Sequence, residues 1–92
     1  ASALNPQDPL VWVEMGIVHA RMGQDVEAEE ALLRGIRMDP GSGRAHFELG
    51  RILVGRGDEP GVESQLRRLR AISSELADSL ALLWKQRSDR SP

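Results

Sequence analysis

The chain has 92 residues, of which 40% are hydrophobic and 28% charged, and a formal net charge of −2. This composition fits one small globular domain, and the low charge speaks against the strong fields of nucleic-acid and anionic-membrane binders. The absence of cysteine excludes disulfides and thiolate chemistry. No signal-peptide pattern or membrane-length apolar run occurs, which favours a cytoplasmic location. Eleven of the twelve basic residues are arginine, a usage typical of GC-rich bacterial sources.

The first predicted elements lie on either side of a linker. Residues 1–8 are expected to hold the end of an upstream helix and the linker, because the residues before Pro6 parallel those before Pro40. Asp8, followed by a proline, predicts a capped helix start. The helix predicted over residues 9–22 is apolar on nearly every side, so it needs cover on more than one face.

A glycine turn and a second, amphipathic helix follow. Gly23 suits the positive φ that ends a helix, and Asp25 is placed to cap the helix predicted over residues 26–38. Acidic residues lie near the start of this helix and arginines near its end, which matches the helix dipole and predicts a solvated outer face. Gly35 interrupts its apolar ridge and predicts a close approach of two helices.

The second half of the chain repeats this order. Residues 39–43 form the strongest break, the next helix is predicted over residues 44–54, and Gly55 to Asp58 are expected to close it. A further helix, opened by Asp58, ends near a serine break, and the last helix is predicted over residues 75–87. The predicted divisions are residues 1–8 as tail and linker, 9–42 and 43–74 as two repeats, 75–88 as a terminal capping helix and 89–92 as a disordered tail.

These elements recur with a spacing of 34 residues. The matched pairs are Pro6/Pro40, Glu14/Glu48, Gly16/Gly50, Gly23/Gly57, Leu32/Leu66 and Arg34/Arg68. A fixed period of this length indicates helical hairpins that stack to bury their apolar faces. Gly16 and Gly50 are expected to lie where the two helices of each hairpin approach most closely.

The repeated unit resembles a known family. The tetratricopeptide pattern is W-x2-L-G-x2-Y, then A-x3-F, then P. At these positions the first unit has Trp12, Met15, Gly16, His19, Ala28, Leu32 and Pro40. The second unit places His46, Leu49, Gly50, Leu53, Val62, Leu66 and Ser74, without the aromatic residue and closing proline. The resemblance covers nearly the whole chain and implies an all-α superhelix of about five helices, with two repeats and a terminal helix.

The resemblance also implies a function. In this family the first helix of each hairpin, the A helix, lines a concave groove that binds an extended peptide or a helix of a partner protein. The groove positions carried over to this chain are Leu10, Val13, Glu14, Ile17, Arg21, Arg44, Phe47, Glu48 and Arg51. Members that hold a terminal carboxylate use Lys, Arg and Asn, whereas Glu14 and Glu48 stand here, which speaks against that ligand.

Other interpretations stay open at this point. Val13, Ile17 and Phe47 are equally suited to contact between adjacent A helices. The chain could act as an adaptor or assembly factor, as an oligomerisation element, or as a regulatory part of a larger protein. His19 and His46 have no local metal-ligand spacing, and no catalytic set can be assembled. We therefore expect a protein or peptide partner, no nucleic acid, no membrane insertion, no cofactor, no metal and no enzymatic activity, with a homo-oligomer as a further option.

Overall fold

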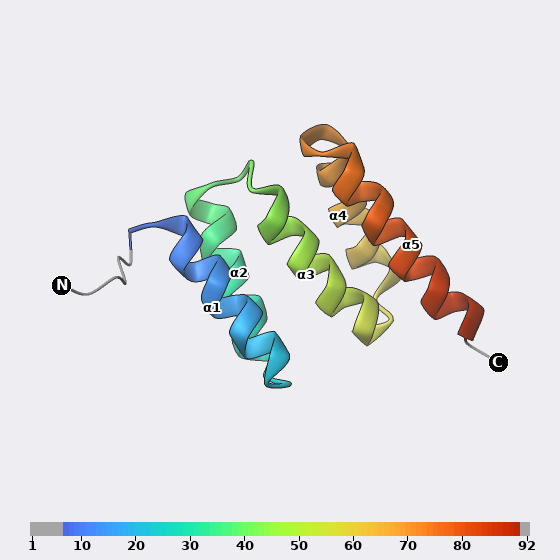
Figure 1. Cartoon of the computed structure of the whole chain (residues 1–92), viewed down its shortest axis with the longest axis horizontal. Helices are drawn as coiled ribbons and strands as arrows, with labels where there is room; N and C mark the ends of the chain where they lie inside the picture. Colours follow the sequence, from blue (N-terminus) through green and yellow to red (C-terminus); the bar gives the residue numbers. More distant parts are fainter. Residues whose placement is uncertain (1–6, 91–92) are drawn as a thin grey trace.

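Five helices succeed one another in the computed structural model, which describes the backbone of residues 7–90 and the side chains of residues 7–87. They are α1 (Pro9–Arg21), α2 (Asp25–Met38), α3 (Gly43–Arg56), α4 (Glu59–Ile72) and α5 (Ser74–Arg90). The helices α1, α3 and α5 lie side by side, with α2 behind α1 and α4 behind α5 (Figure 1). The predicted all-α repeat fold is confirmed, whereas the predicted upstream helix end at residues 1–5 lies outside the described residues.

Short side chains fix the start of four helices. Their oxygens accept backbone N–H bonds: Asp8 from Leu10 at 3.0 Å, Ser42 from Ala45 at 3.2 Å, Asp58 from Gly61 at 3.1 Å and Ser73 from Leu76 at 3.4 Å. Each bond satisfies an N–H that has no partner inside its helix. The prediction that Asp25 caps α2 is wrong, because the helix begins at Asp25 itself and the preceding residue makes no capping bond.

Glycines with positive φ end the A helices. Gly23 has φ 77° and Gly57 has φ 72°. Residues other than glycine rarely adopt this backbone conformation. The helix α3 ends at Gly57, within the segment Gly55 to Asp58 that was expected to close it, but it continues through Gly55 to Arg56, two residues past the predicted end at residue 54. The last helix also passes its predicted end and reaches Arg90, since neither proline nor glycine interrupts residues 88–90.

One hydrophobic cluster runs through all five helices. Its buried members are Val13, Ile17, Ala28, Leu32, Ala45, Leu49, Ile52, Leu53, Val62, Leu66, Leu69, Ala77 and Leu80. The partly buried Phe47, Leu76 and Trp84 pack against it. No hairpin therefore has a core of its own, and the helices are stabilised by stacking, as expected for a repeat array.

Glycines set the distances between helices. A Cβ on Gly16 would lie 2.6 Å from the side chain of Leu32 on α2, and one on Gly35 would lie 3.3 Å from the carbonyl oxygen of Pro9. The close approach predicted at Gly16 is therefore confirmed. At Gly50 the prediction named the wrong neighbour, because a Cβ there would meet Leu80 of α5 at 2.5 Å.

His46 joins three segments in the interior. The side chain is buried, and its Nε2 lies 3.0 Å from the carbonyl oxygen of Pro40. Its Nδ1 lies 2.7 Å from Oε1 of Gln65 on α4. Both ring nitrogens therefore have a hydrogen-bond partner, which a buried polar ring requires, and the ring ties the α2–α3 loop and α3 to α4.

Among the helices of the described residues, none combines the length and the apolar character that a membrane span requires.

Candidate binding groove

A groove runs between the A helices α1 and α3. Its hollow of about 330 Å³ is lined by Ile17, Ala20, Arg21, Asp25, Glu48, Arg51, Ile52 and Gly55. The two isoleucines are buried and form apolar parts of the wall, while the arginines are exposed. We call this hollow the α1–α3 groove. Four of the nine predicted groove residues line it, namely Ile17, Arg21, Glu48 and Arg51.

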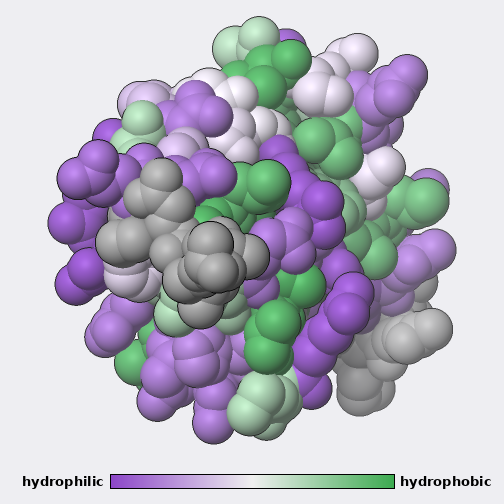
Figure 2. Space-filling view, turned by 60° about the vertical axis from the view of Figure 1, so that its left-hand side comes forward, coloured by the Kyte–Doolittle hydropathy of each residue, from purple (hydrophilic) through white to green (hydrophobic). Residues whose placement is uncertain are grey.

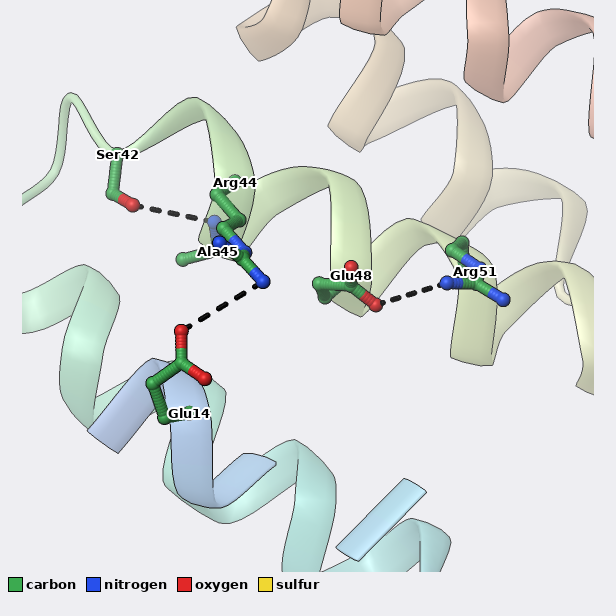
Figure 3. Close-up of polar contacts among 6 residues, drawn as sticks. All are labelled: Glu14, Ser42, Arg44, Ala45, Glu48 and Arg51. Carbon is green, nitrogen blue, oxygen red and sulfur yellow. Dashed lines mark hydrogen bonds and ion pairs between the residues drawn. The ribbon is translucent and has the colours of Figure 1, made fainter. Parts of the chain in front are cut away.

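The charged groups in and beside the groove are only loosely paired. Arg51 lies 3.3 Å from Glu48 one turn away on α3, and Arg44 lies 3.7 Å from Glu14 across the two A helices (Figure 3). Both arginine side chains are more than half exposed, so water weakens these pairs and each contributes little to stability. Their charges therefore stay accessible to a ligand.

Two further charges stand at the α1 side of the groove. Arg21 ends α1 and Asp25 begins α2, and neither forms an ion pair with another residue of the described part of the chain. The groove thus offers guanidinium groups on both walls and carboxylates from Asp25 and Glu48. Its formal charge is balanced, which suits a ligand of mixed polarity rather than a highly charged one.

The other five predicted residues lie elsewhere. Val13 is 2% exposed and packs against Gly35 of α2, so its assignment to an open groove is wrong. Phe47 is half-buried against the core and lines none of the hollows described below. Arg44 is exposed beside the groove, and Leu10 and Glu14 line a different hollow.

Four groove residues were not predicted from the sequence. Ala20, Asp25, Ile52 and Gly55 all line the hollow. Asp25 was interpreted as a helix cap and Gly55 as part of a turn, which hid both from the prediction. The 34-residue period held a usable signal for Gly55, because its counterpart one repeat earlier is the predicted groove residue Arg21.

A second, more apolar hollow lies on the outer face of α1. It measures about 530 Å³ and is lined by Asp8, Leu10, Val11, Glu14, Met15, Val18 and His19. Figure 2 shows the molecule from the α1 side, where hydrophobic residues form patches separated by hydrophilic ones. We call this surface the α1 outer face.

Repeat counterparts explain why this face is apolar. Val18 is 53% exposed, whereas Ile52, which stands 34 residues later, is 7% exposed. Met15 is 39% exposed and its counterpart Leu49 only 4%. The difference arises because α3 is packed by α1, α2, α4 and α5, whereas α1 contacts only α2 and α3 among the described residues. The same side-chain pattern is therefore buried in one repeat and open in the other.

Comparison with known proteins places the chain among helical-repeat proteins. The tetratricopeptide repeat family model matches residues 9–52, a segment that covers α1, α2 and most of α3. Together with the repeated hairpin arrangement, this match confirms the resemblance stated from the sequence, and residues 9–52 belong to the tetratricopeptide repeat family. Repeats of this family generally mediate contacts between proteins and form modules that are not themselves catalytic.

One curated relative is similar over part of the chain. The general transcriptional corepressor ssn6 of Schizosaccharomyces pombe is 44% identical over 36 residues, which make up 39% of this chain and 3% of the corepressor. The chain thus corresponds to a small fraction of that protein's length. No solved structure matches the chain significantly. The bacterial source inferred from arginine usage stays a prediction.

Proposed function

We propose that the chain is a protein-interaction module that binds a segment of a partner protein in the α1–α3 groove. The observation that carries this proposal is the hollow of about 330 Å³ between two A helices, with charges of both signs around buried isoleucines. Such a site suits recognition of a side chain or short segment that combines an apolar anchor with polar flanks.

The residues that line the groove can make different kinds of contact with a partner. Ile17 and Ile52 supply apolar contact, while Arg21 and Arg51 can donate bidentate hydrogen bonds to carboxylate or carbonyl oxygens of a partner. Asp25 can accept hydrogen bonds from backbone or side-chain N–H groups. Because Arg21 and Asp25 have no competing ion pair among the described residues, binding need not first break a strong internal contact.

Charge reversal at matched positions tests this proposal. Arg51→Glu removes a cation from the groove and places two carboxylates beside each other, so partner recovery from an extract of the source organism should fall by about tenfold or more, which corresponds to about 1.4 kcal/mol. Arg68→Glu reverses an exposed charge on α4, outside the groove, and should leave recovery unchanged. The opposite pattern, with both variants folded by circular dichroism, would reject the groove.

We also propose that the chain carries no catalytic centre. The two ring nitrogens of His46 are engaged in structural hydrogen bonds, and His19 bonds Gln24 at the end of α1. Neither histidine lines the α1–α3 groove. Direct assay of a purified preparation for hydrolysis of generic ester and phosphate substrates tests this statement, which a turnover abolished by His19→Ala would contradict.

The α1 outer face supports a second candidate function, self-association. Leu10 and Val18 are more than half exposed there, and their burial between two copies would contribute favourable apolar transfer energy. Sedimentation at two concentrations tests this alternative. A dimer that dissociates in Val18→Glu but persists in Leu82→Glu, a matched exposed site on α5, would support it, whereas a monomer at both concentrations would reject it.

A further inference from the structure

A third hollow lies on the far side of α3, against the terminal helix. It measures about 270 Å³ and is lined by Arg51, Val54, Gly55, Leu83, Gln86 and Arg87. Arg51 and Gly55 also line the α1–α3 groove. The two hollows therefore meet at these two residues, and only the ridge of α3 separates them.

At Gly55 the surface of α3 between the two hollows carries no side chain. This glycine lies inside α3 and is exposed, and a Cβ built on it would meet no atom within 4 Å. Its counterpart one repeat earlier is Arg21, whose long side chain lines the groove. Glycine in a helix is unfavourable relative to alanine, and in the last turn of α3 no described residue packs closely enough to require it at position 55. No side chain therefore stands at the position where the linings of the two hollows meet.

The hollow beyond the ridge has its own chemical character. Among the side chains that the structure describes, its charged lining residues are Arg51 and Arg87, and none of these lining residues is acidic. The guanidinium of Arg87 lies beside the end of α3, where a Cβ on Gly57 would come within 2.8 Å of it, and 5.9 Å from the Trp84 ring centroid. Val54 and Leu83 add apolar surface. The site is thus cationic and partly apolar in a chain whose net charge is −2.

We propose that the binding groove continues over Gly55 onto α5 and holds an extended peptide, with an acidic side chain of that peptide between Arg51 and Arg87. This inference rests on the proposed groove function and assigns Leu83, Gln86 and Arg87 as additional binding residues. It gives α5 a recognition role besides covering the core. Charge complementarity selects an acidic side chain, and Val54 and Leu83 select an apolar residue next to it.

The dimensions favour an extended segment over a helix. Packed helices lie about 8–10 Å apart, so a ligand that crosses from α1 to α5 spans about 16–20 Å. Five or six extended residues cover that length at about 3.3 Å each. A helix of about 10–12 Å diameter would rest on the ridges instead of entering both hollows.

Selection from a phage library of random linear peptides against the full chain supplies the probe. We expect enriched peptides in which Asp or Glu stands next to an apolar residue. In fluorescence anisotropy with one synthetic selected peptide, Arg87→Gln should raise Kd about tenfold, the scale for loss of a hydrogen bond to a charged group. Gly55→Leu should raise Kd by about as much, because its side chain would stand in the path of the peptide between the two hollows. Replacing the acidic residue of the peptide by its amide should do the same.

Matched variants separate binding from folding. Ala71→Leu and Arg68→Gln make the same kinds of change at exposed positions of α4, and should leave Kd unchanged. Gly55→Leu should not lower the thermal midpoint, because its Cβ would have no atom of the described residues within 4 Å and leucine is a better helix former than glycine. A loss of binding in both Gly55→Leu and Arg87→Gln, with intact midpoints, therefore reports the extension, because Gly55 lines both hollows whereas Arg87 lines only the one against α5.

Two results would overturn the inference, and they are distinguishable. If peptide binding is weakened by Arg21→Glu but is unaffected by Gly55→Leu and Arg87→Gln, the α1–α3 groove functions without the extension. If no peptide is enriched, or if binding ignores all groove variants, the extension fails together with the proposed groove.

Discussion

The two hairpins, α1–α2 and α3–α4, have the same spacing along the chain but different separations in space. The helices α1 and α2 pack more closely than α3 and α4. In the first hairpin Gly16 and Gly35 stand at the contact, one on each helix. In the second, Gly50 is retained but the place of Gly35 is taken by the fully buried Leu69. The period thus decides which faces meet, and the size of single residues decides how near the helices come.

The wider hairpin also accepts a third helix. Leu80 of α5 is fully buried and approaches Gly50, so this glycine serves a contact with the terminal helix, whereas Gly16 serves a contact within its hairpin. Equivalent glycines can therefore have different partners. The comparison predicts that enlarging or shrinking side chains will have different effects in the two hairpins.

The largest effect is expected from Leu69→Ala. Leu69 is fully buried in the core at the place that Gly35 holds in the first hairpin. Its truncation leaves a cavity, so the free energy of unfolding should fall by about 3 kcal/mol. Urea denaturation followed by circular dichroism measures the change. Leu82→Ala, at a leucine that is 55% exposed, is the matched control and should have little effect. Equal losses in both variants would show that Leu69 does not set the spacing.

The reciprocal change, Gly35→Leu, should lower the free energy of unfolding by about 2 kcal/mol. Its Cβ would lie 3.0 Å from Cγ2 of Val13 and 3.3 Å from a backbone carbonyl of α1, and overpacking of this kind is destabilising. Denaturation of Gly55→Leu provides the control, because that position is open. A stable Gly35→Leu protein would mean that the first hairpin can widen freely to the spacing of the second.

Gly50→Ala should lower the free energy of unfolding by a smaller amount, about 1 kcal/mol. The effect is smaller because the end of the Leu80 side chain can shift to relieve part of the clash. The shift should loosen α5, and the half-buried Trp84 reports it. In a Trp12→Phe background the tryptophan emission should move to longer wavelength. Unchanged emission would indicate that α5 is not positioned through this contact.

The sequence predicted those features of the fold that depend on local chemistry. Asp8 and Asp58 as helix caps and Gly23 as a helix end follow from neighbouring residues, and the order of the hairpins follows from the 34-residue period. The partner of Gly50 did not follow, because it depends on the position of a helix about 30 residues later. In the site, Arg21 and Arg51 were groove positions implied by the family resemblance, and both are exposed and line the hollow. The burial of Val13 was not implied, because it depends on how closely Gly35 lets α2 approach.

The smallest effect, of opposite sign, is expected from Gly55→Ala. Alanine is a better helix former and its Cβ meets no atom, so unfolding free energy should rise by about 0.5–1 kcal/mol. Thermal denaturation with a two-state fit measures this. A destabilised protein would show that the ridge of α3 is in contact with something that the described residues do not account for.

The exposed apolar residues of α1 suggest a way to lengthen the repeat array by one hairpin. Val11, Met15 and Val18 occupy the places that Ala45, Leu49 and Ile52 hold in α3, where they are buried. A duplicate of residues 9–42 fused in register before Pro9 would therefore pack on this exposed face of α1. That face has the same pattern of apolar residues as the face of α3 that is buried in the present structure. We expect such a fusion to lengthen the superhelix by one hairpin without redesign of the junction and to raise the thermal midpoint, since burial of that face would add to the shared core.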